Sequence, residues 1–392
     1  MTHFGQSDAS ASYLASFHGK AMQLGSQNTA SCLDCHAAQW ADIHIMKSRK
    51  DTDSPTNPNH LPDTCRSPAC HPTAGYAIST AAIHLDLAKT RGVEYFIAAI
   101  FVLLILFTFG PSVLLQILEL LQILAGRHDP DHHRHRELAD RLMADPRGRR
   151  ALHRFTPHQR VQHWVLFAAF TALVVTGFPI KFADRPWAAW LISLMRSLTI
   201  ARTLHRWAGA LLLAGLVYHL LYMLHHTWRQ GRRTGKGFLH ACLELPMVMR
   251  WDDLRHLWQV LGYLLFLRRK RPEGDRFGPK EKFEYFGVFW GSVLLGITGL
   301  LMWANAWTTA HLTGRVLTIA ALIHTFEAFL ALLHVGVIHV IGVFFAPTVL
   351  PMSLAMVTGD TPTEELAEAH AGMLMRVEQQ LKTASMEEVG RG

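Results

Sequence analysis

Long apolar runs alternate along this chain with polar segments that hold most of its charged residues. Five of the runs reach the length of about 20 residues that a helix needs to cross a hydrocarbon core about 30 Å thick. They lie near residues 95–124, 161–180, 203–224, 286–304 and 317–345. The pattern predicts an all-α membrane protein, a transmembrane bundle of five spans with a small irregular domain ahead of the first span.

Positive charge is concentrated in alternate connections between these runs. The 126–160 segment carries nine Lys and Arg residues and the 227–283 segment carries thirteen, against three in 181–200 and one in 305–316. Because short loops rich in Lys and Arg stay in the cytoplasm, the two basic segments and the C-terminal tail are expected there. With five spans, residues 1–92 are then expected on the opposite, extracytoplasmic side of the bacterial inner membrane.

Composition favours a membrane protein over a nucleic-acid-binding protein. Only 17% of the 392 residues are charged, against about 25% in an average soluble protein. The formal charge of +8 comes from the basic segments beside the apolar runs, so no nucleic-acid partner is expected. Four of the five cysteines belong to two short motifs, which leaves Cys242 alone and gives no disulfide framework. Residues 1–30 contain no apolar run typical of a signal peptide, so the export route stays open.

Two cysteine–histidine motifs precede the first span. Cys32-Leu-Asp-Cys35-His36 has the C-x-x-C-H spacing of haem c attachment, in which both thiols bond to the haem and the histidine ligates iron. Cys65-Arg-Ser-Pro-Ala-Cys70-His71 repeats the motif with four spacer residues. A zinc knuckle of the four cysteines is the alternative, although zinc does not require a histidine after each second cysteine. The motifs predict two covalent haem c groups with His36 and His71 as proximal ligands.

Histidines inside the apolar runs are spaced for paired ligation of haem b. His205 and His219 are fourteen residues apart on one predicted helix, and His324 and His339 are fifteen apart on another. At 100° and 1.5 Å per residue, each helix carries its two histidines on roughly one face, about 21–23 Å apart. His205 then lies level with His324 at an outer site. At the inner site only two of His163, His219 and His339 can ligate one iron, and a third haem b would need a further ligand.

The bundle resembles the di-haem cytochrome b subunits of formate dehydrogenases and nickel–iron hydrogenases over residues 156–359. The likeness rests on Arg160-Val-Gln-His163-Trp164, Ala201-Arg-Thr-Leu-His205-Arg-Trp-Ala-Gly209, Glu281-Lys-Phe-Glu-Tyr285, Thr298-Gly299-Leu300 and His324-Thr-Phe-Glu-Ala328 with His339. The resemblance implies that His205 and His324 hold the outer haem, and His163 and His339 the inner haem. His219 departs from it and resembles cytochromes b fused to multihaem c-type domains, so the inner ligand stays open between His163 and His219.

Residues 11–92 resemble the small multihaem cytochromes c that are linked to quinol dehydrogenases. Ser16-Phe-His18-Gly19, Asp42-Ile-His44 and His84 resemble the segments that supply distal iron ligands in such proteins. Two haems need only two distal ligands, so the choice among His18, His44 and His84 stays open. His60, in the turn-rich Asn57-Pro-Asn-His60-Leu-Pro62, matches least well.

We therefore expect five parts. They are an extracytoplasmic di-haem cytochrome c domain (1–92), a first transmembrane helix (93–125), a cytoplasmic basic linker (126–160), a four-helix di-haem cytochrome b domain (161–346) and a cytoplasmic tail (347–392). In the tail, Leu366, Ala369, Met373 and Val377 recur at helical spacing, which predicts an amphipathic helix on the membrane surface or against a partner.

This organisation is typical of a membrane electron-transfer subunit. The expected route joins the membrane quinone pool to an extracytoplasmic cytochrome or redox subunit, within a complex of several subunits that would act as a quinol dehydrogenase. Arg160 and Lys282 are candidate contacts for the quinone ring. The alternative function is an anchor subunit of a hydrogenase- or formate-dehydrogenase-like complex with catalysis on another chain, since no motif for transforming an organic substrate occurs here.

Overall fold

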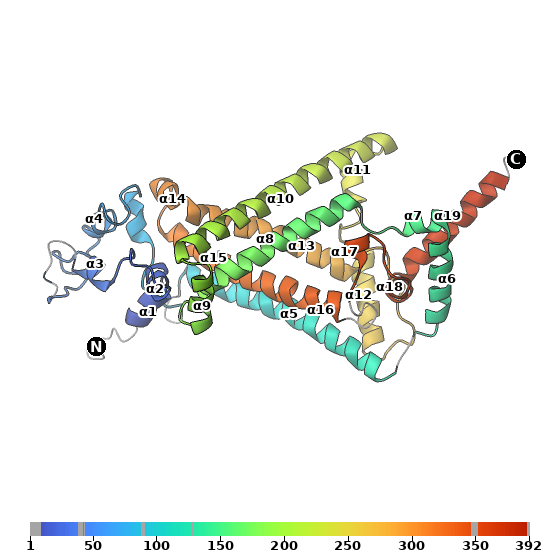
Figure 1. Ribbon diagram of the computed structural model, residues 1–392, viewed down its shortest axis with the longest axis horizontal. Helices are drawn as coiled ribbons and strands as arrows, with labels where there is room; N and C mark the ends of the chain where they lie inside the picture. The colour runs from blue at the N-terminus through green and yellow to red at the C-terminus, as the bar shows by residue number, and fades with distance from the viewer. Residues whose placement is uncertain are drawn as a thin grey trace. The chain divides into compact units, whose positions relative to one another are not determined.

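The computed structural model describes residues 9–37, 42, 44–87, 91–126, 129–345 and 352–389. Arg127 and His128 of the predicted linker, and the first residues of the predicted tail, lie outside these ranges. Every regular element in the described part of the chain is a helix (Figure 1). The all-α class predicted from the sequence is thereby confirmed.

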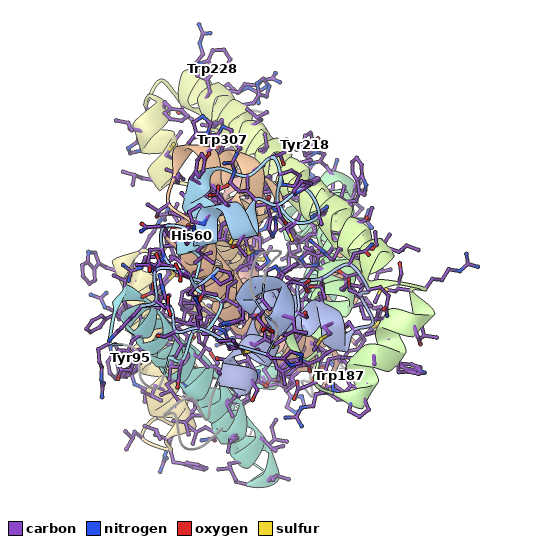
Figure 2. The ribbon with its side chains drawn as sticks, turned by 90° about the vertical axis from the view of Figure 1, so that its left-hand side faces the viewer. His60, Tyr95, Trp187, Tyr218, Trp228 and Trp307 are labelled. Carbon is purple, nitrogen blue, oxygen red and sulfur yellow. The ribbon has the colours of Figure 1, made fainter. Side chains whose placement is uncertain are left out.

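Within the described residues, five helices are long and apolar enough to cross a membrane, as the apolar runs predicted. They are α5 (Val93–Leu124), α8 (Pro157–Lys181), α10 (Leu198–Thr234), α13 (Pro279–Trp303) and a last span made of α15 (Arg315–Ala331), the π-helical η3 (Leu332–His339) and α16 (Val340–Phe344). Leu106 and Phe107 of α5 are largely exposed, as expected of side chains that face lipid. Trp187 and Trp228 point away from their helices (Figure 2), and tryptophan is enriched at membrane–water interfaces.

Spans α8 and α10 extend beyond their apolar runs. Pro157 occupies the first turn of α8, where its missing N–H costs nothing. Thr156 and Gln159 exchange side-chain and main-chain hydrogen bonds across that turn in the manner of a capping box. The helix therefore begins before residue 161 and includes His163 well inside it. At its C-terminal end, α10 extends past its apolar run to Thr234. It ends before Gly235, whose φ of +69° suits glycine.

The chain divides into two compact units, and the division passes through the long helices. The first unit comprises Met1–Leu103, Ala168–Ala214 and Gly291–Phe329. Its shorter helices are α1 (Ala9–Ala15), α2 (Phe17–Gln23), α3 (Cys32–His36), α4 (Leu61–Cys65), η2 (Tyr76–Thr80), α9 (Pro186–Leu194) and α14 (Asn305–His311). Ala21 and Leu24 share a buried core with Ala188 and Ile192 of α9, so the N-terminal segment packs on the first unit's own helices.

Polar contacts reinforce that packing in the first unit. The main-chain N–H of Gly75 donates to Thr309 Oγ1 over 3.1 Å. A Cβ at Gly75 would lie 2.1 Å from the Thr309 carbonyl oxygen, so only glycine permits this approach. Arg315, which begins α15, donates two hydrogen bonds of 2.6 and 2.8 Å to Glu94, near the start of α5.

The second unit comprises Leu104–Phe167, Gly215–Trp290 and Leu330–Gly392. Its shorter helices are α6 (His132–Ala144), α7 (Pro146–Leu152), α11 (Phe238–Leu243), α12 (Trp251–Leu264), α17 (Ala355–Thr358), α18 (Thr363–Ala369) and α19 (Ala371–Val389). The predicted basic linker therefore folds into helices rather than an open loop. Ion pairs hold it near the spans, because Arg154 contacts both Glu281 at the start of α13 and Glu365 of α18.

The tail differs from the expected surface helix. Its described residues form three helices, α17, α18 and α19, and Leu366, Met373 and Val377 are buried against Leu138 and Leu142 of α6. The apolar stripe that the sequence showed is covered by the chain's own linker, not by a membrane surface. This packing was not predicted because residues 126–160 were expected to form a loop, although α6 carries a complementary apolar stripe.

Candidate functional site

The first unit brings His205 on α10 and His324 on α15 together. Their ring centroids lie 6.2 Å apart. Two imidazole nitrogens that each lie about 2.0 Å from one metal ion place their ring centroids about 6.3 Å apart, because each nitrogen lies about 1.15 Å from its own centroid. The spacing therefore fits one metal ion between the two rings.

A threonine hydroxyl is hydrogen-bonded to Nδ1 of each of these rings. Thr176 Oγ1 on α8 lies 2.9 Å from His205 Nδ1, and Thr298 Oγ1 on α13 lies 3.0 Å from His324 Nδ1. Each hydroxyl also donates its own proton to a main-chain carbonyl four residues earlier, over 2.6 and 2.7 Å. Since the hydroxyl proton is already used, each Nδ1 must carry a hydrogen and donate it, which leaves Nε2 with a free lone pair for a metal.

A glycine follows each threonine and gives the ring its space. A Cβ at Gly177 would lie 2.9 Å from His205 Cε1, and one at Gly299 would lie 3.3 Å from His324 Cε1. A Thr-Gly pair on α8 thus supports His205, and a second Thr-Gly pair on α13 supports His324. The sequence analysis singled out Thr298-Gly299 within a family motif, but it overlooked Thr176-Gly177.

The second unit brings His163 on α8 and His339 at the end of η3 together, with ring centroids 6.4 Å apart. His339 Nδ1 lies 3.1 Å from Glu284 Oε2 of α13, so the imidazole donates a hydrogen bond to a carboxylate. The Nδ1 atom of His163 is buried and has no hydrogen-bond partner among the described residues. This pair also has the spacing of bis-histidine ligation.

The last span is not a regular α-helix between its two histidines. Residues Leu332–His339 form π-helical turns, which contain more residues per turn than an α-helix. The rotation of 100° per residue used for His324 and His339 therefore does not hold across this segment. His334, which lies inside it, packs between Phe109 and Phe283, and its Nδ1 bonds to the Leu330 carbonyl.

His219 is engaged by other side chains. Its Nδ1 lies 2.8 Å from Gln162 Oε1, and its Nε2 lies 2.7 Å from the Tyr285 hydroxyl. Gln162 Nε2 in turn lies 2.8 Å from His158 Nδ1. Both ring nitrogens of His219 are thus occupied, and the ring that faces His339 is that of His163.

The N-terminal segment of the first unit contains two further histidine pairs. His18 lies 6.1 Å from His71, and His36 lies 6.3 Å from His84, measured between ring centroids. Ser12 Oγ lies 2.9 Å from His84 Nδ1. His44 is exposed and donates its main-chain N–H to Asp42. Each motif histidine therefore faces a different one of the candidate distal ligands.

Burial favours the neutral, metal-binding form of His18 and His36. It lowers the pKa of the His18 imidazole, and the neighbouring His71 lowers it further. Burial likewise lowers the pKa of His36, with a smaller contribution from His84. Neutral imidazoles at neutral pH offer a lone pair to iron. Burial also raises the pKa of the Cys35 thiol to about 11.

None of the four motif cysteines forms a disulfide. Within the described part of the chain, no group of three or more His, Cys, Asp or Glu side chains is arranged to hold a metal ion. The adjacent His132 and His133 of α6 also have rings 6.2 Å apart, but His132 Nε2 is bonded to Glu364 of the tail.

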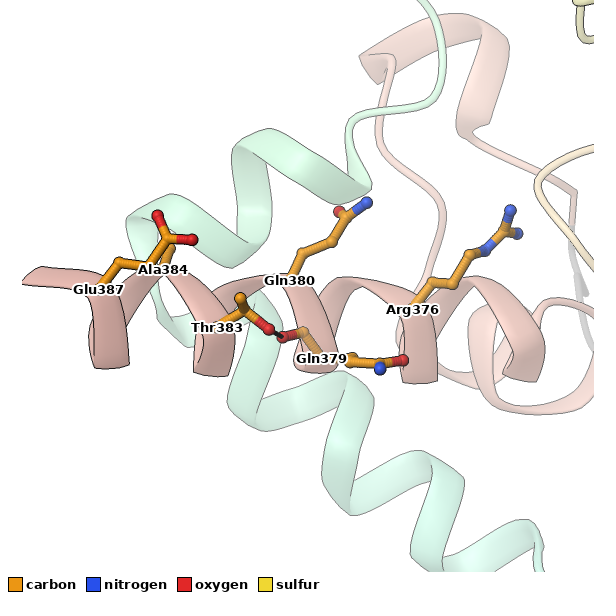
Figure 3. Close-up of a pocket in the computed structure, with 6 residues that line it drawn as sticks. All are labelled: Arg376, Gln379, Gln380, Thr383, Ala384 and Glu387. Carbon is orange, nitrogen blue, oxygen red and sulfur yellow. Dashed lines mark hydrogen bonds between the residues drawn. The ribbon is translucent and has the colours of Figure 1, made fainter.

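Two predicted quinone contacts have partners within the protein. Lys282 is 8% exposed, and its Nζ lies 2.7 and 2.9 Å from the two carboxylate oxygens of Asp253. Arg160 donates to the main-chain carbonyl of Val357. A hollow along α19 (Figure 3) has none of the candidate residues in its lining. Its lining residues are Arg376, Gln379, Gln380, Thr383, Ala384 and Glu387.

Apolar spanning helices that carry opposed histidine pairs define a membrane-bound cytochrome b. The sequence model of the prokaryotic cytochrome b561 family matches residues 154–359, and the chain belongs to that family. The match includes His163, His205, His324 and His339 and leaves residues 1–153 outside. Membership implies b-type haem and a role in membrane electron transfer.

Curated relatives agree with this class at low identity. The cytochrome b556 subunit of Haemophilus influenzae formate dehydrogenase is 24% identical over 172 residues, which cover 44% of this chain. The chain spans 62% of that relative's length. The Escherichia coli K12 formate dehydrogenase cytochrome b556(fdo) subunit is 22% identical over 187 residues, 48% of this chain and 76% of the relative.

Proposed function

We propose that this protein carries electrons between the membrane quinone pool and an extracytoplasmic redox partner, through two haem b and two haem c groups. The observation that carries the proposal is the set of four histidine pairs with ring separations between 6.1 and 6.4 Å. Each separation would suit two histidine ligands on one iron. Bound haem supplies one-electron chemistry, and the protein fixes its position, ligation and surroundings.

The haem b ligands follow from the pairs in the spans. His205 and His324 would hold the outer haem, because threonines orient both rings with Nε2 free. His163 and His339 would hold the inner haem. His219 is then not a ligand, because both of its nitrogens bond to protein side chains, and the number of haem b groups is two.

The haem c ligands follow from the N-terminal pairs. Cys32 and Cys35 would bind one haem, with His36 and the distal His84 on its iron. For the second haem, Cys65 and Cys70 are the attachment residues, and His71 with the distal His18 are the ligands. His44 and His60 would be spare.

Quinone exchange is proposed beside the inner haem. Since Arg160 and Lys282 are engaged elsewhere, the better candidate for contact with the ring oxygens is the Tyr285 hydroxyl, which can accept a hydrogen bond while it donates its own to His219. The Tyr285 hydroxyl oxygen lies 2.7 Å from His219 Nε2. Such a hydroxyl–imidazole pair can accept the proton that accompanies each electron from a quinol.

The proposed orientation in the membrane is supported by the distribution of charge, and the proposed partners are supported by the relatives. The Lys and Arg content of the 126–160 and 227–283 segments supports a cytoplasmic position for both and an extracytoplasmic one for residues 1–92. The named relatives are subunits of formate dehydrogenases, which favours membership of a membrane complex. An anchor subunit with catalysis on another chain is therefore the second candidate function.

Haem counting tests the proposal. A pyridine haemochrome spectrum of the purified chain separates covalent haem c from extractable haem b, and we expect two of each per chain. His205→Ala or His324→Ala should remove one haem b and leave both haem c groups attached. A variant that keeps its full haem b spectrum would contradict the bundle assignment. Lack of haem c, in a host able to attach it, would remove the outward electron path.

A further inference from the structure

The two pairs of histidines in the spans differ in what accepts their Nδ1 hydrogen bonds. In the outer pair, both acceptors are neutral hydroxyls, those of Thr176 and Thr298. In the inner pair, His339 donates to the Glu284 carboxylate over 3.1 Å. The Glu284 side chain is largely buried, and its Oε1 atom has no hydrogen-bond partner among the described residues.

A buried carboxylate in a membrane span is costly and usually has a function. No Lys or Arg in the described part of the chain forms an ion pair with Glu284, whose recorded partner is the His339 imidazole. The carboxylate therefore acts mainly on that ring. The sequence showed Glu284 only as part of the Glu281-Lys-Phe-Glu-Tyr285 motif and gave it no role.

The group that accepts the Nδ1 hydrogen bond changes how strongly the imidazole donates electrons to iron. A carboxylate draws the Nδ1 proton toward itself, which makes the ring more negative and a stronger donor at Nε2. A stronger donor stabilises ferric iron over ferrous iron and so lowers the reduction potential of the haem. A threonine hydroxyl whose proton is committed to a carbonyl accepts the same bond without a negative charge, so its effect is smaller.

Charge around the outer pair acts in the opposite direction. Arg206 follows His205 directly and Arg202 lies one turn before it on α10, whereas His163 has a single arginine, Arg160, one turn before it on α8. The guanidinium groups rest on aromatic rings of the first unit, Arg202 on Phe17 at 4.8 Å and Arg206 on Trp303 at 5.7 Å. Nearby positive charge favours ferrous iron and raises the potential of a haem held by His205.

We propose that Glu284 is a positioning residue that makes the inner haem the lower-potential member of the pair, while Thr176 and Thr298 position the ligands of the higher-potential outer haem. The proposal rests on the ligand assignment of the proposed function. It gives the bundle a direction, because an electron that enters at the inner haem passes spontaneously to the outer one.

A redox titration of the purified full-length chain, followed in the haem b absorption band, tests the proposal. Glu284→Gln keeps a hydrogen-bond acceptor for His339 but removes the charge, so the lower-potential wave should move to a more positive potential. Thr298→Val removes the outer acceptor and should raise only the higher wave, and Thr298→Ser should restore it. Glu327→Gln, which removes another buried carboxylate of the spans, is the control and should leave the lower wave in place.

Each outcome decides the matter. A shift of the lower wave alone in Glu284→Gln supports the proposal. An unmoved lower wave, a shift of the higher wave instead, or loss of a haem from this variant overturns it. Failure of the proposed function gives a different result. In that case His163→Ala or His339→Ala would retain both haem b groups, and the titration of the wild-type chain would not show two haem b waves.

Discussion

Replacing Gly177 by alanine should damage the outer haem site although it favours the helix. The new Cβ would lie 2.9 Å from His205 Cε1 and 3.3 Å from its Nδ1. Carbon atoms in contact are normally about 3.5–4.0 Å apart, so the ring must retreat by about 0.6–1 Å. Bonds between metals and histidine nitrogens tolerate only about 0.2 Å. The displaced ring therefore cannot keep both its bond to iron and its hydrogen bond to Thr176.

The magnitude separates this effect from general instability. Glycine to alanine in a helix interior stabilises the helix by up to about 1 kcal/mol, so Gly177→Ala should not unfold α8. At Gly299 the corresponding Cβ would lie 3.3 Å from His324 Cε1, and a movement of about 0.2–0.7 Å would relieve the contact. We thus expect Gly299→Ala to weaken the site much less.

Haem content and spin state measure the outcome. Gly177→Ala should lose one haem b in the pyridine haemochrome assay, or convert one haem from a low-spin to a high-spin electron paramagnetic resonance signal. Gly209→Ala is the matched control, because its Cβ would have no neighbour closer than 3.9 Å. If Gly177→Ala retains two low-spin haem b groups, the close approach of His205 to α8 is wrong.

Three further predictions address other sites. His219→Ala should keep both haem b groups whereas His163→Ala loses one, by haemochrome assay; the opposite result would reverse the inner ligand assignment. His18→Ala should keep its covalent haem c but turn that haem high-spin, and His44→Ala should change neither property. Burial lowers the pKa of His370 from 6.5 to about 4. As pH falls, the His370 imidazole is therefore protonated in the unfolded tail before it is protonated in the docked tail. The docking of the tail should be fully stable above about pH 6.5 and lose up to about 3 kcal/mol as pH falls toward about 4. Limited proteolysis at about pH 7.5 and about pH 5 measures this, and equal tail release would contradict it.

Hydropathy predicted the five spans because a bilayer demands apolar length, and each predicted run coincides with one described spanning helix. Histidine spacing and family resemblance together indicated His205 with His324, which the structure brings together. Their role as iron ligands stays a prediction, as does that of the N-terminal pairs.

Other features depend on contacts between helices, which spacing along one helix does not reveal. The approach of Thr176 to His205 joins residues on two different spans. The choice of His163 over His219 depends on Gln162 and Tyr285, which occupy the nitrogens of His219. The π-helical turns at Leu332–His339 have no distinctive composition, since the segment is as apolar as the rest of the span.

The packing of the tail on the linker has a consequence for the order in which the protein is made. Leu142 and Leu152 of the linker are buried by Leu366 and Leu374, which the ribosome adds more than two hundred residues later. At about 5–20 residues per second, the linker's apolar face stays uncovered for roughly 10–45 s during synthesis. All four later spans are translated within that interval. Closure of this small core therefore follows translation of the last span, and a nascent chain that stalls earlier exposes an apolar surface that chaperones and proteases can recognise.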